Sequence, residues 1–356
     1  MYFKFIICFI LFVAITCNSL DDWQKFKHDY NKQYKTVEEE AERKQIFLRN
    51  MENMKEYQRT HPDATFTMKI NHLTDRRSKE LVTGSKFFSN IHSEKNQKSI
   101  QIESNVPTSL DWRDKGVITG VYDQGQMGTA SAIAAVEVIE SYHAIRTKNL
   151  VKGSISQVIN CCPEDTNIFD CILTKLGGSI CGATFYNSSS AACDRDACQP
   201  VAAFNKINRF EPANEDTMLT IIQESPLYIG IDASQIGFEM YTQGVYRDKG
   251  CSQTTIDHTL QLIGYGESSG IPYWLCKNSW GTNWGDRGYI RIERGVNTCG
   301  IANIVEQVEY IDVTDVTDVT DVTDTTDVTG DAVRQFTFNG LSLALFCFVL
   351  HLFSNL

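Results

Sequence analysis

The number and position of the cysteines constrain the fold of this chain more than any other feature. Twelve cysteines occur in 356 residues, and Cys8, Cys17 and Cys347 lie in apolar segments at the two ends. Residues 1–19 have the layout of a secretory signal peptide, with one basic residue, an apolar run and a small polar stretch. A buried N-terminal helix is the alternative, but this run is apolar on all sides. A signal peptide leads to an oxidising compartment, so we expect disulfide bonds.

Six of the remaining cysteines are concentrated within residues 161–198. They are Cys161, Cys162, Cys171, Cys181, Cys193 and Cys198. Six cysteines allow fifteen connectivities, which the sequence does not resolve, and we predict three disulfide bonds within the segment. A metal site is the rival interpretation, but secretion favours disulfides. We therefore expect no metal ion and no cofactor.

Composition and charge limit the classes of partner. The chain is 42% hydrophobic, which is enough for a sizeable core, and its formal net charge is -11. An acidic chain with no long basic run is not expected to bind nucleic acid. Seven aspartates lie between Asp312 and Asp331 with no basic residue among them, so the net charge describes this segment more than the folded part.

The C-terminal part repeats an Asp-Val-Thr triplet from Asp312 onwards. A period of three fits neither a helix face nor a strand, and we expect residues 312–331 to form an extended stalk whose threonines could carry O-glycans. A repeat without function is the alternative. Residues 332–356 contain a spacer and an apolar run, which is the order of a removable GPI-anchor signal. A tail-anchored helix is the alternative, although the run is short for a membrane span.

Residues 20–104 are charged and have helical periodicity. Aromatic residues recur at spacings of three and four between Trp23 and Tyr34, and a second helix is predicted from about residue 36 to residue 59. One stripe of that second helix is formed by Glu39, Arg43, Ile46, Phe47, Asn50 and Met54. A strand and a capped helix start are predicted within residues 66–75.

At Val106 the chain changes to a segment rich in glycines, cysteines and short strands. The block from Ile271 to Ile301 resembles the papain family of cysteine peptidases, of the cathepsin-L-like kind. The resemblance implies an α+β, two-lobed papain-like fold over residues 105–311, with a helical left lobe and an antiparallel β-barrel-like right lobe. It also implies that residues 20–104 are the family's inhibitory helical propeptide.

The propeptide resemblance is carried by the predicted second helix. It matches the family's E-R-F-N-I-N pattern at Glu39, Arg43, Phe47 and Asn50. It departs from the pattern at Met54 and Gln58, where isoleucine and asparagine are usual.

Much of the family's catalytic machinery is present by resemblance. His258 matches the general base, and Asn278 matches the residue that orients its imidazole, with Trp280 shielding that hydrogen bond. Gln124 matches the side-chain donor of the oxyanion hole.

The nucleophile is missing. The family pattern is close to Q-G-x-C-G-S-C-W-A-F, whereas this chain reads Q-G-Q-M-G-T-A-S-A-I from Gln124 onwards, so Ala130 occupies the cysteine position. Losing the nucleophile of a comparable triad lowers turnover by on the order of a million-fold, so the resemblance implies an inactive homologue. Thr129 or Ser131 is a candidate displaced nucleophile, but successive helix residues are rotated by about 100°, which points either hydroxyl away from His258.

Other departures surround the missing cysteine. Met127 replaces a cysteine that normally forms a disulfide, and Ser131 replaces a tryptophan. Glycines that should follow Cys161 and pair with substrate backbone have no counterpart. We therefore expect an altered substrate cleft.

The resemblance also suggests two disulfide pairings. It pairs Cys251 with Cys299, and it favours Cys161 with Cys193 or Cys198.

Three further positions carry expectations. The usual partner of Cys171 is the position now held by Met127, so Cys171 must be free or paired differently. Cys276 lies where the family has a buried aliphatic residue, and we expect a free buried thiol there. Asn187 begins an N-glycosylation sequon.

Together these features predict a secreted pseudo-protease, anchored at the cell surface, that binds or competes for extracellular protein ligands or protease inhibitors. It resembles inactivated cysteine protease paralogues of several animal groups, parasitic mites among them. An enzyme with a displaced nucleophile and an inert structural or antigenic surface protein are the alternatives. Active relatives commonly remove their own propeptide, which this chain could not do, so the propeptide could also stay in the cleft.

Overall fold

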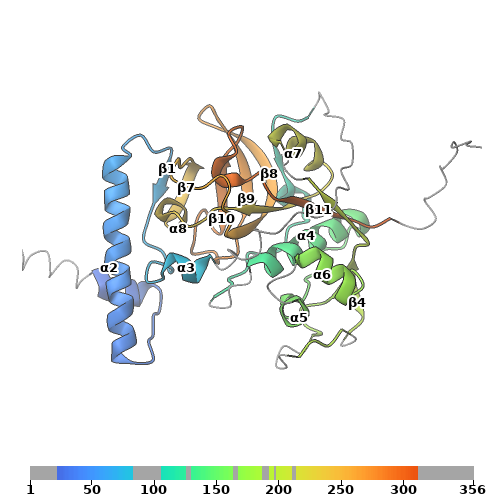
Figure 1. Ribbon diagram of the computed structural model, residues 1–356, viewed down its shortest axis with the longest axis horizontal. Coiled ribbons are helices and arrows are strands. Elements are labelled where there is room, and N and C mark those ends of the chain that lie inside the picture. The colour runs from blue at the N-terminus through green and yellow to red at the C-terminus, as the bar shows by residue number, and fades with distance from the viewer. Residues whose placement is uncertain are drawn as a thin grey trace, which may run out of the picture. The chain divides into compact units, whose positions relative to one another are not determined.

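The computed structural model describes residues 22–82, 106–125, 130–162, 167–186, 192–195, 198–210 and 214–311 (Figure 1). The chain divides into two units, Met1–Ile311 and Asp312–Leu356, and all described residues belong to the first. The predicted signal peptide, stalk, anchor signal and Asn187 sequon lie outside the described residues. Within the described ranges, no helix is long and apolar enough to cross a membrane.

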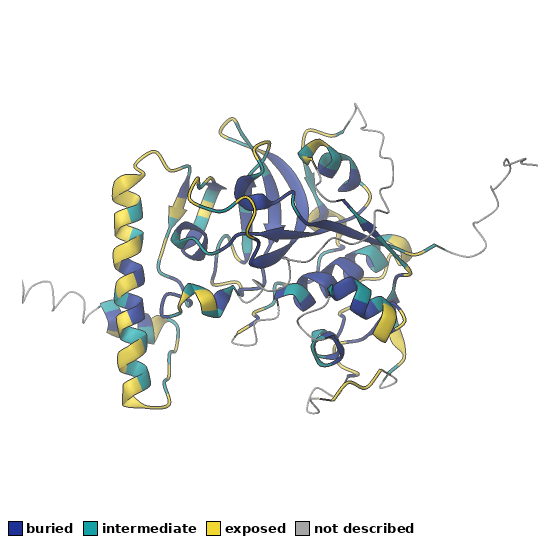
Figure 2. Cartoon of the chain, in the orientation of Figure 1, coloured by how far each residue is buried: buried dark blue, intermediate teal, exposed yellow. Residues whose placement is uncertain are grey.

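The N-terminal segment (residues 22–82) folds around a small aromatic core of its own. Residues 22–29 are helical, and α2 (Val37–Thr60) follows, capped by the Thr36 hydroxyl, which accepts a hydrogen bond from the Glu39 amide. Phe47 of α2 packs against Phe26 with ring centroids 4.7 Å apart. The other face of α2 is exposed (Figure 2). The helix predicted for residues 36–59 is therefore present, displaced by one residue at each end.

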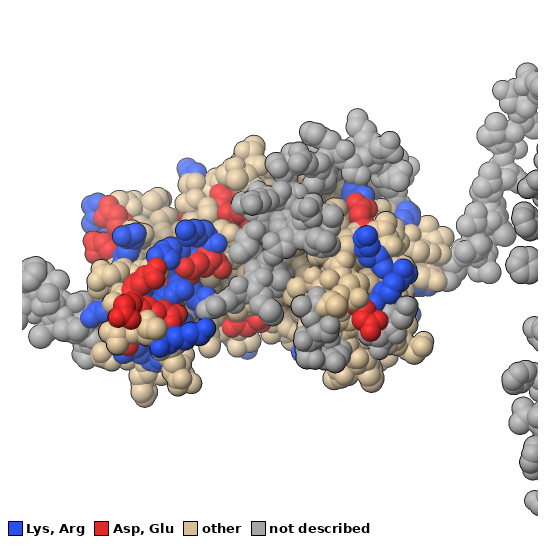
Figure 3. Space-filling model, turned by 60° about the horizontal axis from the view of Figure 1, so that its bottom comes forward, with Lys and Arg blue, Asp and Glu red and all other residues tan. Residues whose placement is uncertain are grey.

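After α2 the N-terminal segment continues through β1 (Phe66–Met68) to the short helix α3 (Ser78–Leu81). Lys, Arg, Asp and Glu side chains gather on the part of the surface that this segment forms, at the left of Figure 3. Opposite charges alternate there, as in the ion pairs Lys27–Glu40 and Arg77–Glu42. Such surface pairs contribute little to stability compared with the aromatic core of the segment.

The main body (residues 106–311) begins with β2 (Leu110–Asp111), the 3-10 turn η1 (Trp112–Lys115) and a group of helices. The helices are α4 (Ala130–Thr147), α5 (Ile155–Cys161) and α6 (Ile168–Lys175), followed by the hairpin strands β3 (Ser179–Cys181) and β4 (Pro200–Ala203). Most of α4 is buried, because it lies between the other helices and the large sheet (Figure 2). The main body has two hydrophobic cores, and these helices enclose one of them.

The other core lies under a sheet with the strand order β1-β7-β10-β9-β8-β6-β11-β5, and β2 pairs with β8. The strands not yet given are β5 (Lys206–Arg209), β6 (Leu227–Ile231), β7 (Tyr241–Tyr246), β8 (His258–Ser268), β9 (Ile271–Lys277), β10 (Tyr289–Glu293) and β11 (Val305–Glu309). The helices α7 (Glu215–Ile221) and α8 (Ile236–Glu239) and the turn η2 (Thr298–Gly300) connect them.

This sheet differs in two ways from the expected antiparallel barrel. It does not close among the described residues, since β1 and β5 stand at opposite ends of the strand order. In addition, β10 pairs with β7 in the parallel sense. At one end of the sheet the strand beside β7 is β1, which comes from the N-terminal segment and not from the main body, and β1 has a partner strand on one side only among the described residues.

The structure gives the cysteine connectivity that the sequence did not resolve. Three bonds lie within residues 161–198, as predicted: Cys161–Cys193, Cys162–Cys171 and Cys181–Cys198. Cys171 is thus paired with a neighbour nine positions away. The fourth bond joins Cys251 to Cys299, and Cys276 is a free, buried thiol.

Candidate functional site

Ala130 is the first residue of α4, and its methyl group is buried, with 7% of the residue exposed. The start of a buried helix is where a thiolate would gain from the helix dipole. The alanine has no group that can ionise or attack a carbonyl. Met127 and Thr129 lie in residues 126–129, outside the described residues.

His258, Asn278 and Trp280 lie together, as the resemblance implied. His258 opens β8, and its Nε2 lies 2.8 Å from Asn278 Oδ1, while the Trp280 ring is centred 4.9 Å from the imidazole. Asn278 Oδ1 also accepts the Ser279 amide hydrogen at 2.7 Å, which identifies this atom as the oxygen. His258 therefore donates through Nε2, and its Nδ1 carries a lone pair.

The imidazole of His258 is neutral in this environment. The residue is 1% exposed, and its Nδ1 has no hydrogen-bond partner among the described residues. Burial lowers the pKa of His258 to about 4, and the hydrogen bond to Asn278 offsets only part of this effect. The base is oriented correctly, but no thiol stands where it could give up a proton.

Gln124, at the oxyanion position, is engaged by the N-terminal segment. Its Nε2 donates to the backbone carbonyl of Leu81 in α3 at 3.1 Å. Its Oε1 accepts the Ser279 hydroxyl at 2.7 Å, which fixes the orientation of the amide. The donor that would stabilise an oxyanion thus holds a peptide carbonyl of the chain itself.

Besides the pairing of β1 with β7, hydrogen bonds of Asn71 and Lys69 hold the N-terminal segment against the main body. The Asn71 side-chain amide donates to the Glu239 carbonyl at 2.8 Å, and the Lys69 amide donates to the Met240 carbonyl at 2.9 Å. Leu81 is only 2% exposed and joins the core under the sheet. The segment therefore crosses the site from β7 to Gln124.

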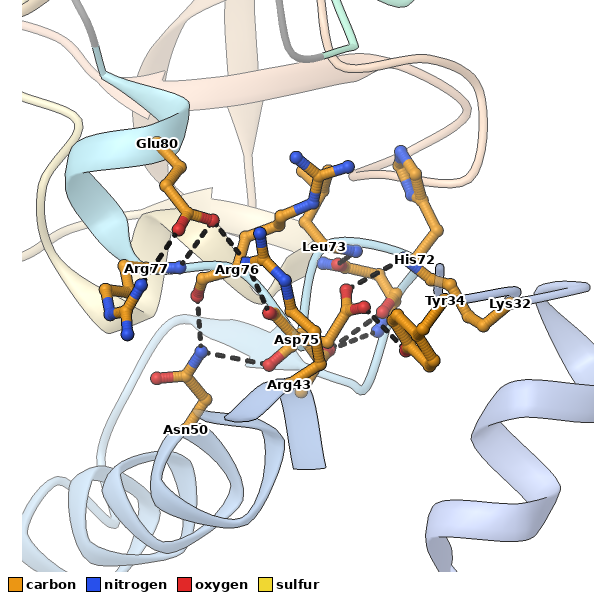
Figure 4. A network of polar contacts seen from close by, with 12 residues as sticks. Lys32, Tyr34, Arg43, Asn50, His72, Leu73, Asp75, Arg76, Arg77 and Glu80 are labelled. Carbon is orange, nitrogen blue, oxygen red and sulfur yellow. Dashed lines mark hydrogen bonds and ion pairs between the residues drawn. The ribbon is translucent and has the colours of Figure 1, made fainter. Parts of the chain in front are cut away.

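A polar network inside the N-terminal segment positions the residues that lead into α3 (Figure 4). Asp75 is 2% exposed and accepts hydrogen bonds from Lys32 Nζ and Tyr34 Oη, each at 2.8 Å. Asn50 of α2 donates to the carbonyls of Thr74 and Arg76 on either side of Asp75, at 2.9 and 2.8 Å.

Arg43, a second polar residue of the stripe, donates to Glu80 Oε2 at 2.6 Å and to the Asp75 carbonyl at 3.2 Å (Figure 4). The stripe residues found in the sequence thus fix the backbone of residues 74–76. The buried carboxylate at their centre was not singled out from the sequence.

Ser131 does not face the histidine as a second nucleophile would. Its Oγ lies 2.9 Å from the hydroxyl of Tyr228 on β6, and burial raises the pKa of Tyr228 well above its usual value. His258 Nδ1 has no such partner. This geometry agrees with the rotation argument made from the helix period.

A buried ion pair beneath the site was also missed. Lys277, which directly precedes Asn278, lies 2.9 Å from Glu137 of α4, with both side chains almost fully buried. Glu140, one turn further along α4, accepts hydrogen bonds from the Thr119 hydroxyl and the Gly153 amide, and burial raises its pKa to about 7. The available signal was a pair of glutamates, Glu137 and Glu140, in the mostly apolar stretch of residues 132–140.

Comparison with known proteins identifies the family to which the main body and the N-terminal segment belong. Residues 106–308 match the family described as "Papain family cysteine protease", and residues 23–81 match "Cathepsin propeptide inhibitor domain (I29)". The chain therefore belongs to the papain family of cysteine proteases, in which it is cathepsin L-like and carries the family's propeptide.

Among curated proteins, the chain is similar to "Digestive cysteine proteinase 2" of Homarus americanus, with 30% identity over 85% of this chain and 98% of that protein. It is 31% identical to "Cathepsin S" of Bos taurus, over 79% of this chain and 90% of the relative.

Among solved structures, the digestive procathepsin L2 proteinase of the Tenebrio molitor larval midgut matches with a TM-score of 0.72 at 26% identity. That match covers 82% of this chain and 99% of the other. The recombinant stem bromelain precursor gives the same identity, TM-score and coverage. These matches confirm the α+β, two-lobed papain-like fold with a preceding propeptide.

Proposed function

We propose that this chain is a catalytically inactive papain-family protein that acts by binding or competing for protein partners. The observation that carries the proposal is Ala130 at the start of α4, in a chain that keeps the hydrogen-bonded pair of His258 and Asn278. Without a thiol, the site lacks the group that forms the covalent intermediate. The loss of such a nucleophile lowers turnover by on the order of a million-fold.

The position of the N-terminal segment supports a binding role over residual catalysis. Gln124 Nε2 is occupied by the Leu81 carbonyl, and Asn71 and Lys69 hold the segment along the main body. Because the chain has no nucleophile to cut itself, the segment stays in the cleft unless another protease removes it. The proposal therefore includes the N-terminal segment as the resident ligand of the cleft.

We place the protein outside the cell, held at the surface through the predicted stalk and GPI-anchor signal. The expected partners are extracellular protein ligands or protease inhibitors. Four disulfide bonds among the described residues agree with an oxidising compartment.

The decisive test compares the full chain with its His258→Ala variant on broad panels of peptide and ester substrates. We expect no turnover above buffer from either protein, before or after another protease has cut between the N-terminal segment and the main body. Turnover by the parent chain that disappears in His258→Ala would establish an enzyme and refute the proposal.

Binding is tested separately with the same preparations. The anchored form is screened against extracellular protein substrates and protease inhibitors, and we expect a specific partner. The complete absence of binding at micromolar concentration counts against a binding role. Normal surface display after deletion of residues 312–329 would in turn argue against a role centred on the stalk.

A further inference from the structure

Glu239 is a buried carboxylic acid on the surface that the N-terminal segment covers. It is the last residue of α8 and is only 3% exposed. Its backbone is fixed, because its carbonyl accepts hydrogen bonds from the Asn71 amide at 2.8 Å and from the Trp284 indole at 3.1 Å. Its side chain meets the hydroxyl of Ser78 in α3.

The N-terminal segment leaves this carboxylic acid incompletely satisfied. Glu239 Oε1 has no hydrogen-bond partner among the described residues. Ser78 supplies one hydroxyl, which is itself within 3.3 Å of the Ser234 carbonyl. A buried carboxyl oxygen without a donor is unfavourable, so the segment is a poor chemical match at this point although it fits sterically.

The charges around Glu239 are of its own sign. Asp257, which directly precedes His258, is 7% exposed and raises the pKa of Glu239 further, after burial, to about 8. Asp232 stands beside Asp257 and is itself 4% exposed. His258 is neutral, as described above, and no lysine or arginine of the described ranges forms an ion pair with Glu239.

We infer that the surface at α8, when the N-terminal segment is displaced, binds a basic side chain of a peptide ligand through Glu239. An arginine fits best, because its planar fork can donate to both carboxylate oxygens at once. The inference rests on the proposed binding function and specifies it, since it gives the chemistry of the ligand that the cleft selects.

The three carboxyl groups explain why the selected ligand is basic and not merely polar. A cation at Glu239 also interacts favourably with Asp257, which is itself beside Asp232, whereas an acidic or neutral side chain would leave Glu239 without a counterion. A ligand without a cation is disfavoured because it buries the Glu239 carboxylate without a partner. This penalty contributes to selectivity as much as the contact between Glu239 and the arginine does.

The experiment uses the whole chain, with a recognition sequence for a site-specific protease placed between Val82 and Val106. No cysteine lies between Cys17 and Cys161, so after cutting no disulfide to the main body can retain the N-terminal segment. Two peptides that differ only by arginine or glutamine at one position are titrated into the cut protein. Release of the N-terminal segment is followed by size-exclusion chromatography.

We expect the arginine peptide to displace the segment at a concentration at least about tenfold lower than the glutamine peptide. This factor is what one hydrogen bond between charged groups contributes to the binding free energy. The ratio should fall to about one in Glu239→Gln, which keeps the shape of the side chain. It should persist in Glu267→Gln, a matched change of an exposed glutamate at the end of β8.

Equal displacement by the two peptides would overturn the inference, and so would a preference for arginine that survives in Glu239→Gln. Failure of both peptides to displace the segment at millimolar concentration would overturn it as well. Mass spectrometry of the same mixtures reports on the proposed function independently. Peptide cleavage there would refute inactivity, while leaving the preference of the site for arginine to be judged from the displacement ratio.

Discussion

Replacing Glu239 with glutamine should make the full chain more stable at alkaline pH than the parent. Burial raises the pKa of Glu239 to about 8 in the folded chain, from 4.5 for an exposed glutamate. Between these two values the folded chain binds a proton that the unfolded chain releases. The stability associated with that proton is therefore fully present below pH 4.5 and is lost as the pH rises towards 8.

The size of the effect follows from the same two pKa values. Each unit of difference corresponds to about 1.4 kcal/mol, so ionising Glu239 in the folded chain costs about 4 to 5 kcal/mol at pH 9. Local opening at α3 would relieve part of this cost, and we expect Glu239→Gln to recover at least about 2 kcal/mol at that pH. At pH 4.5 the two proteins should be equally stable to within about 1 kcal/mol.

The assay is equilibrium unfolding in urea of the oxidised full chain, with parent and variant measured side by side from pH 4.5 to pH 9. Glu140, whose pKa burial raises to about 7, is present in both proteins and cancels in the difference. Asp257 interacts with Glu239, so a change in its titration is part of the measured effect. Glu267→Gln, on the exposed end of β8, should follow the parent at every pH. A difference between Glu239→Gln and the parent that does not change with pH would falsify the reasoning.

Four further predictions concern the N-terminal segment and the site. Phe47→Ala should destabilise the N-terminal segment by about 3 to 5 kcal/mol, because Phe47 is fully buried in its aromatic core, and hydrogen exchange of residues 22–82 measures this. Asp75→Asn should destabilise the same segment by about 3 kcal/mol, since it leaves the Lys32 ammonium without its buried counterion, and limited proteolysis follows it. Gln124→Ala should weaken retention of the segment in the cut chain by about 1 kcal/mol, read as the extent of its release. Ala130→Cys should give little peptide hydrolysis, because changes surround the position and Gln124 is already occupied.

The two stability predictions each have a matched control variant. Val37→Ala, at a residue 80% exposed in the first turn of α2, should leave hydrogen exchange unchanged where Phe47→Ala accelerates it. Asp29→Asn removes an exposed ion pair with Lys25 and should not alter proteolysis, in contrast to Asp75→Asn. Equal effects of a variant and its control would contradict the role assigned to the buried residue. Full recovery of activity in Ala130→Cys would show that the cleft is far less altered than proposed.

The parts of the fold that depend on local patterns were predictable from the sequence. The period of α2, its capping by Thr36 and its buried stripe follow from residues close together in the chain. His258, Asn278 and Trp280 were found through a resemblance carried by long continuous blocks, and the structure brings them together.

The features that the sequence could not supply depend on contacts between distant residues. The connectivity that pairs Cys171 with Cys162 is one of the fifteen that six cysteines allow. The burial of Glu239 depends on its packing against Ser78, more than 150 positions earlier in the chain, and nothing in α8 alone indicates it. The resemblance implied a barrel-like lobe, whereas the described strands form an open sheet that ends in β1 and β5, because pairing between distant segments decides which strands lie at the edges.

The pairing of β1 with β7 has a consequence for the solubility of the protein. The N-terminal segment supplies the outermost strand of the sheet, so in the intact chain the backbone donors and acceptors of β7 are partnered on both sides. Removal of the segment would turn β7 into a bare edge, and bare edges are templates on which copies of a protein join strand to strand and aggregate. In the uncut chain, β1 therefore covers β7 and prevents association of molecules through that strand.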